Sequence, residues 1–244
     1  MNSELLLAKA LLLAHGFDQA AVAAMFEYGA KSDPRSFKYP WEDFEKRIHE
    51  LEAEHVYLVG YGSLLNPRSA AKSVRNTPSN GHPPVVALGA RRVFNYRMPD
   101  GIFEQYGVEP GARDRAALNA EPAATGIING RLIEFAVSDL PNLRAREIAY
   151  DLQPVTCLSW DKPNADPFTA LVLCCNYEFW QGRRYIDNSL TPYEPYYQLC
   201  RTGAEMVSPA FLQLYLKTCF LADRSTTAFD LEAERAGAVD RLYT

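Results

Sequence analysis

The chain has 244 residues, 48% of them hydrophobic and 12% aromatic, so it can bury a large core and is too apolar to be disordered. A formal net charge of −5 leaves no broad basic surface, which argues against nucleic acid as a partner. The uncharged runs near the start, such as residues 19–26, are too short to span a bilayer, and no secretory signal is apparent, so we expect a cytoplasmic protein without a membrane partner.

The first part of the chain, residues 1–54, is predicted to form a helical extension ahead of a main domain over residues 55–244. Residues 3–29 carry a wide apolar face that a glycine interrupts, and Asp18 is placed to cap a second helix. After a polar stretch with prolines, residues 41–54 read as another helix, whose apolar side consists of Trp41, Phe44, Ile48 and Leu51. No pattern in this extension indicates a chemical role.

The main domain alternates strand-like segments with glycine, proline and polar breaks. Short apolar or alternating runs predict strands over residues 56–59, 85–97, 116–121, 125–135, 152–160 and 168–177. Helices are expected over residues 139–150, 207–222 and 227–237, and a polar, tyrosine-rich segment covers residues 178–199. These elements predict an α+β fold: a mixed β-sheet or small barrel with flanking helices, preceded by the N-terminal helical extension.

The first predicted strand runs directly into a segment with two glycines, Gly60-Tyr61-Gly62-Ser63-Leu64-Leu65. We call residues 60–65 the glycine loop. The two glycines permit another group to approach the backbone closely, and N–H groups at the end of a strand can cradle an anion. A plain tight turn between core elements has the same pattern, so the loop alone is a weak indication of a site.

Glu147 precedes an apolar triplet near the end of the helix expected over residues 139–150. A carboxylate held against apolar groups is costly as a charge, so its pKa tends to rise, which suits general acid/base work near neutral pH. A surface ion pair of Glu147 with Arg144 or Arg146 would explain the same pattern without any chemistry. Asp151 is a weaker candidate for the acid/base role.

The cysteines and histidines give no indication of a metal site. The five cysteines have no C-x-x-C spacing and mostly lie among apolar residues, which predicts buried, reduced thiols. The four histidines occur singly, and no pair has the spacing of metal ligands. We expect neither a metal nor another cofactor.

Several segments in one order resemble the γ-glutamylcyclotransferase-like superfamily, and the resemblance covers roughly residues 55–222. The glycine loop is similar to the family's Y-G-S loop, and Leu64 is closer to its glutathione-acting branch than to members with asparagine there. The other similar segments are a second-strand region at residues 117–122 and 126–130, an R-E-x-x-Y segment at residues 146–150, and a late segment ending in Gly-Ala at residues 196–204.

The resemblance implies a γ-glutamylcyclotransferase-like fold and an enzyme that cleaves a γ-glutamyl amide without a cofactor, releasing 5-oxoproline and a free amine. It implies that Glu147 is the catalytic acid/base. The substrate-binding residues that it implies are Tyr61, Gly62, Ser63, Leu64, Leu65 and Tyr196. The loop donors would bind either the carbonyl oxygen or the α-carboxylate of the substrate, and the residues that could replace Tyr196 are Tyr185, Tyr193 and Tyr197.

Two other functions remain open at this point. The same residues could remove a γ-glutamyl protecting group from a biosynthetic intermediate. Alternatively, the fold could serve as a ligand-binding or interaction module without catalysis, because one fold hosts unrelated functions. The expected partner is a small γ-glutamyl compound, and the sequence does not indicate the oligomeric state.

Overall fold

The computed structural model describes residues 3–31, 40–50, 52–72, 74, 77–98, 115–147, 149–175, 178–180 and 182–242. The helices are α1 (Ser3–Ala14), α2 (Gln19–Lys31), α3 (Trp41–Glu50), η1 (Ser63–Leu65), α4 (Pro67–Ala70), η2 (Val137–Asp139), α6 (Leu140–Arg146), α7 (Glu194–Glu205), α8 (Pro209–Thr218) and α9 (Ala228–Leu242). The strands are β1 (His55–Gly60), β2 (Pro84–Arg97), β3 (Ala116–Ala136), β4 (Asp151–Ser159), β5 (Phe168–Cys174), β6 (Phe179–Trp180), β7 (Arg183–Arg184) and β8 (Cys219–Phe220).

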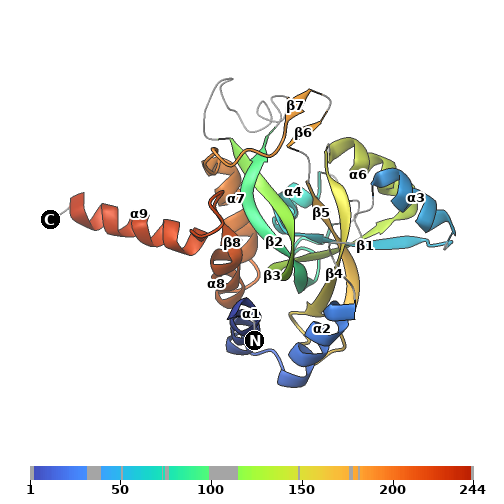
Figure 1. Cartoon of the computed structure of the whole chain (residues 1–244), viewed down its shortest axis with the longest axis horizontal. Helices are drawn as coiled ribbons and strands as arrows, with labels where there is room; N and C mark the ends of the chain where they lie inside the picture. Colours follow the sequence, from blue (N-terminus) through green and yellow to red (C-terminus); the bar gives the residue numbers. More distant parts are fainter. Residues whose placement is uncertain are drawn as a thin grey trace.

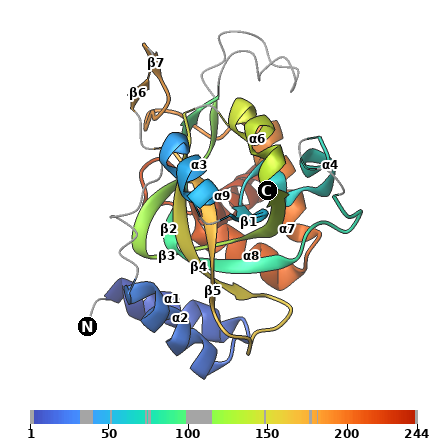
Figure 2. The ribbon, with the colours of Figure 1, turned by 90° about the vertical axis from the view of Figure 1, so that its right-hand side faces the viewer.

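A six-stranded mixed sheet in the order β3-β1-β5-β4-β2-β8 forms the centre of the molecule. The pairs β1–β5 and β2–β8 are parallel, and the other pairs of the sheet are antiparallel. Strand β3 pairs with β2 as well as with β1, so the hydrogen-bonded neighbours close into a ring (Figures 1 and 2). The predicted α+β class with a mixed sheet and flanking helices is confirmed.

The two strands predicted over residues 116–121 and 125–135 form one strand of 21 residues, β3. Its register against β2 shifts between Leu88 and Gly89, so the pairing accommodates extra β3 residues at this point. Gly126 lies at the shift, where an added Cβ would come within 2.5 Å of the Ala90 carbonyl oxygen. The glycine therefore marks a bulge within a strand, where the sequence suggested a break between two strands.

The helices before β1 pack on two different parts of the sheet. Apolar residues of α1 and α2 form a cluster with residues of β2, β3 and β4, and Asp18 caps α2 by accepting hydrogen bonds from the Ala20 and Ala21 N–H groups, as predicted. Helix α3 lies elsewhere, beside α6 (Figure 2). Its predicted apolar side is buried in the main core through Trp41, Phe44 and Ile48, whereas Leu51 lies outside the described residues.

The C-terminal helices include one that the sequence reading missed. Helix α7 occupies residues assigned partly to the polar, tyrosine-rich segment, and it packs against η1. The predicted helix over residues 207–222 is α8 followed by the short strand β8, and α9 projects away from the body of the molecule (Figure 1). In the part of the chain that the structure describes, no helix is both long and apolar enough to cross a membrane.

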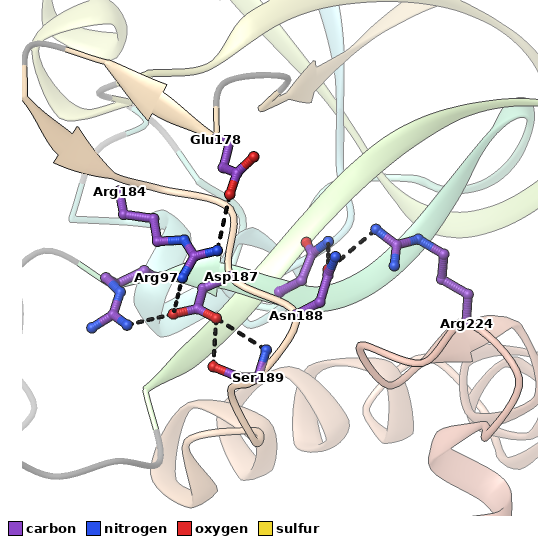
Figure 3. Close-up of polar contacts among 8 residues, drawn as sticks. Arg97, Glu178, Arg184, Asp187, Asn188, Ser189 and Arg224 are labelled. Carbon is purple, nitrogen blue, oxygen red and sulfur yellow. Dashed lines mark hydrogen bonds and ion pairs between the residues drawn. The ribbon is translucent and has the colours of Figure 1, made fainter.

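A polar cluster around Asp187 fixes the segment before α7 to β2 (Figure 3). The Asp187 carboxylate accepts hydrogen bonds from Ser189 N–H at 3.0 Å, Ser189 Oγ at 2.6 Å and Arg97 Nη2 at 2.5 Å. Arg184 lies 3.7 Å from the same carboxylate and donates to Glu178 at 2.9 Å. Burial alone would raise the pKa of Asp187, but the bonds from Ser189 and Arg97 and the charge of Arg184 outweigh it and lower the pKa to about 2.

Candidate active site

The glycine loop leaves the end of β1 and turns at once into η1. An added Cβ at Gly60 would lie 2.7 Å from the Leu64 Cβ, and one at Gly62 would lie 2.6 Å from the Tyr196 hydroxyl oxygen. At both positions another group approaches the glycine so closely that a side chain would force a neighbouring group to shift. Beyond the loop, the Asn66 side chain caps α4 by accepting a hydrogen bond from Arg68 N–H at 3.0 Å.

Two long-range hydrogen bonds hold Tyr61 in the middle of this loop. Its hydroxyl donates to the Leu173 carbonyl oxygen on β5 at 2.6 Å. Its own carbonyl oxygen accepts a hydrogen bond from Arg92 Nη1 on β2 at 3.1 Å. Because both partners belong to sheet strands, the backbone of the loop is tied to the sheet from two sides.

Arg92 is fully buried, with 0% of its surface exposed, and the sequence reading did not single it out. Besides Tyr61, its guanidinium group donates to the Asn129 backbone and side-chain oxygens at 3.0 and 2.8 Å and to Thr218 Oγ1 at 3.2 Å. The guanidinium carbon also lies 4.1 Å from the centre of the Tyr215 ring. A charged residue inside the apolar run of β2 was the available sequence signal.

Glu147 caps the C-terminal end of α6, so the helix predicted over residues 139–150 ends earlier than expected. The Glu147 N–H donates to the Leu143 carbonyl oxygen at 2.9 Å, and its backbone has left the helical region, with φ −94° and ψ 68°. Ala149 follows with φ 61°, in the left-handed region, before β4 begins at Asp151. This sharp turn directs the chain from α6 into the sheet and leaves Glu147 half-buried.

One cavity brings the glycine loop and Glu147 together, although they lie far apart in the sequence. The space between its lining residues, open solvent included, is about 340 Å³. Its described lining residues are Val59, Gly60, Tyr61, Gly62, Ser63, Leu64, Leu118, Glu147, Tyr150, Leu173 and Tyr196. We call this cavity the loop pocket.

Most of the site residues predicted from the sequence line the loop pocket, and the exceptions are Leu65 and Asp151. Leu65 is fully buried in the core and is not among the described lining residues. Asp151, the weaker candidate for the acid/base role, is buried in β4 and does not line the pocket either.

Among the alternative tyrosines, only Tyr196 belongs to the described lining. Tyr197 donates a hydrogen bond to Glu232 at 2.7 Å, and Tyr185 packs beside Tyr96 with ring centres 5.9 Å apart. Tyr193 lines a separate groove between the start of α7 and α9. The choice of Tyr196 over its neighbours is therefore the one that the geometry favours.

Tyr61 and Tyr150 line the loop pocket beside Glu147. Burial raises the pKa of Tyr61 and of Tyr150 far above the ordinary value, and the negative charge of nearby Glu147 raises both further. The Tyr150 hydroxyl donates to the Leu118 carbonyl oxygen at 3.1 Å, as that of Tyr61 does to Leu173. Both phenol groups thus use their proton on the backbone, and their rings shape the pocket.

Metal ligands and reactive thiols are not part of the loop pocket as described. Within the described ranges, no three histidine, cysteine, aspartate or glutamate side chains are grouped so that they could hold a metal ion. All five cysteines are free and buried, as predicted, and burial raises the pKa of Cys157 and Cys200. The carboxylate among the described lining residues belongs to Glu147.

Comparisons with known proteins give matches of fold alone. No protein-family model matches the chain, and no curated protein matches its sequence. Among solved structures, YkqA from Bacillus subtilis is similar with a TM-score of 0.46 and 18% identity over 70% of this chain, which spans 56% of the YkqA chain. A structure described as gamma-glutamyl cyclotransferase matches with a TM-score of 0.46 and 11% identity, over 66% of this chain and 86% of that one.

An uncharacterised protein from Homo sapiens is similar with a TM-score of 0.43 and 11% identity, over 67% of this chain and 87% of that one. One of these three structures carries the name of the superfamily that the sequence motifs resemble. Because all three TM-scores lie below 0.5, the matches describe a likeness in the arrangement of elements.

Proposed function

We propose that this chain is a cyclotransferase that converts a γ-glutamyl amide into 5-oxoproline and a free amine. The observation that supports the proposal best is the loop pocket itself, because one carboxylate and a glycine loop line the same small cavity. Cyclisation needs a base beside the α-amine of the substrate and fixed donors beside its carbonyl or carboxylate oxygens, and these two features supply them.

In the proposed reaction, Glu147 first accepts a proton from the α-ammonium group of the bound substrate. The resulting amine attacks the γ-carbonyl carbon, a new C–N bond closes the five-membered ring, and the carbonyl oxygen becomes an oxyanion. When this intermediate collapses, the original amide C–N bond breaks. Two protons pass from the attacking to the leaving nitrogen, carried by Glu147, so the amine leaves as an ammonium ion and the carboxylate is regenerated.

The glycine loop is proposed to supply the donors. The N–H groups of Leu65 and Asn66 already bond within the turn, to the Gly62 and Ser63 carbonyl oxygens at 2.9 and 3.2 Å. The earlier N–H groups, at Gly62 and Leu64, are therefore the candidates for an oxyanion or an α-carboxylate. Intramolecular attack also gains from the shape of the pocket, because a glutamyl chain held folded has already lost the freedom that opposes ring closure.

Tyr196 is proposed as a substrate contact beside the glycine loop. An added Cβ at Gly62 would lie 2.6 Å from the Tyr196 hydroxyl oxygen, so this hydroxyl lies directly against the glycine loop. From there it can hydrogen-bond a polar group of the glutamyl moiety, and it closes the pocket on the side of α7.

The test is a panel of γ-glutamyl compounds with different leaving groups: glutathione, a γ-glutamyl amino acid and a γ-glutamyl alkylamine. We expect at least one to release 5-oxoproline and an equal amount of free amine, measured together by chromatography. Release of free glutamate in place of 5-oxoproline would show hydrolysis and refute cyclisation. No turnover of any compound would favour a non-catalytic module.

A further inference from the structure

Helix α3 touches the chain on both sides of Glu147, although the sequence indicated no chemical role for this part of the protein. Its first residue, Trp41, is buried, and its indole N–H donates to the Tyr150 carbonyl oxygen at 2.8 Å. The indole also packs edge-on against Phe44, with ring centres 6.2 Å apart. Because indole has a single donor and no acceptor, this bond accounts for its whole hydrogen-bonding capacity.

The second contact reaches α6, just before Glu147. Arg144 pairs with Glu45 at 3.1 Å and also with Glu42, both on the first turns of α3. These side chains are substantially exposed, so the pairs contribute little to stability and mainly orient the two helices. The buried bond from Trp41 is therefore the stronger of the two attachments.

The segment between these attachments needs support. After Glu147 the chain passes through the left-handed turn at Ala149, a conformation unfavourable for a residue with a side chain. Regular pairing with β5 begins only at Asp151, which lies opposite Cys174. The Trp41 bond holds the intervening carbonyl of Tyr150, whose ring stacks on Tyr96 at 4.6 Å and whose hydroxyl is fixed to Leu118.

We propose that α3 is a positioning element for the acid of the loop pocket, with Trp41 as the positioning residue that acts through Tyr150 on Glu147. The inference rests on the proposed function in so far as it concerns turnover. Its structural part, that Trp41 fixes the backbone between α6 and β4, stands independently of any activity.

The test compares Trp41→Phe with Trp160→Phe in the full chain. Phenylalanine keeps an aromatic ring at position 41 and removes the donor. Trp160 is the matched control because it packs on α8 and on the helix pair α1–α2, against Phe211 and Phe17, away from the described lining of the loop pocket. Hydrogen exchange of the amides in residues 143–152 is measured first, because it requires no substrate.

We expect exchange in residues 143–152 to become about tenfold faster in Trp41→Phe, the factor that corresponds to the loss of one ordinary buried hydrogen bond. Exchange in the glycine loop should not change, and Trp160→Phe should leave residues 143–152 as in the parent. Unchanged exchange in Trp41→Phe would overturn the inference, whether or not the protein proves to be a cyclotransferase.

With a turned-over substrate, kcat of Trp41→Phe should fall about tenfold while KM stays within about twofold, because the bond affects Glu147 and not the loop. In a Glu147→Gln background, Trp41→Phe should reduce the residual rate no further. An equal loss in both backgrounds would mean that Trp41 does not act through Glu147. If Trp41→Phe does not fold, exchange of the Trp41 indole N–H is measured in the parent protein, because that proton forms the bond to the Tyr150 carbonyl oxygen. Exchange as slow as that of the amides in residues 150–152 supports the inference, and exchange much faster than theirs overturns it.

Discussion

Replacing Gly62 with alanine should destabilise the protein through one identifiable contact. An alanine Cβ at this position would lie 2.6 Å from the Tyr196 hydroxyl oxygen, whereas ordinary contacts begin at 3.4 Å and the next nearest atoms, on Leu118 and the Tyr196 ring, lie 3.8 Å away. Overpacking of this kind typically costs about 1–3 kcal/mol in the free energy of unfolding. The hydroxyl or the loop must shift to accommodate the added methyl group.

The hydroxyl can be removed, which makes the expectation specific. In a Tyr196→Phe background the added methyl meets only atoms at ordinary distance, so the part of the cost due to the clash should disappear. A double-mutant cycle of the four proteins, measured by urea unfolding with circular dichroism, should therefore give a coupling of at least about 1 kcal/mol. Costs of Gly62→Ala that do not involve the hydroxyl cancel in the cycle.

Additivity of the two substitutions within about 0.5 kcal/mol would refute the reasoning, because independent sites add to that accuracy. It would mean that the Tyr196 hydroxyl does not lie against the glycine loop, and the wall assigned to Tyr196 in the loop pocket would be wrong. The experiment depends on no substrate, so it tests the geometry of the site separately from its chemistry.

Three further predictions concern the loop, the acid stability and the chemistry. Arg92→Lys should lower the free energy of unfolding by about 2–4 kcal/mol in urea titrations, since one ammonium cannot replace the buried guanidinium bonds, whereas Arg91→Lys next to it should cost under about 0.5 kcal/mol. The pKa of Asp187 is lowered from an ordinary 3.8 to about 2, so the stabilising contribution of its carboxylate is present above pH 3.8 and is lost as the pH falls toward 2. Asp187→Asn should therefore flatten the pH dependence of the melting temperature between pH 3.8 and 2, and an unchanged pH dependence would contradict this. Glu147→Gln should lower the rate of 5-oxoproline release by a factor of about 10²–10⁴ while the melting temperature stays unchanged. Glu134→Gln, on the surface, is the control and should keep the parent rate. A rate of Glu147→Gln near that of the parent would show that Glu147 takes no part in the mechanism.

The fold class was predictable because its signals are local. Apolar runs bounded by glycine and proline indicated the strands of the sheet, and the capping aspartate Asp18 marked the start of α2. Helix α7 was missed because its proline and tyrosines resemble a loop. Its buried positions nevertheless follow a helical spacing, at Tyr196, Tyr197, Cys200, Gly203 and Ala204. Proline at the first turn of a helix is favourable, which is how Pro195 fits there.

The candidate site was only partly predictable, for a different reason. Glu147 and the glycine loop stood out because a carboxylate beside apolar residues and two close glycines are unusual locally, and their functional roles remain predictions. The residues that hold them in place, Arg92 and Trp41, act through partners far away in the sequence. In the sequence alone, Arg92 looks like any arginine of a strand and Trp41 like any tryptophan of a helix, because their partners Tyr61 and Tyr150 become neighbours only in the folded chain.

The closed ring of strand pairings also has a consequence for how the protein folds. The bond between Tyr61 and Leu173 joins positions 112 residues apart, and β1 finds both of its sheet neighbours, β3 and β5, much later in the chain. Such high contact order slows folding, because long loops must lose entropy by closing before the strands can pair and stabilise the chain. The loop pocket should accordingly form late, when β1 pairs with its two distant partners.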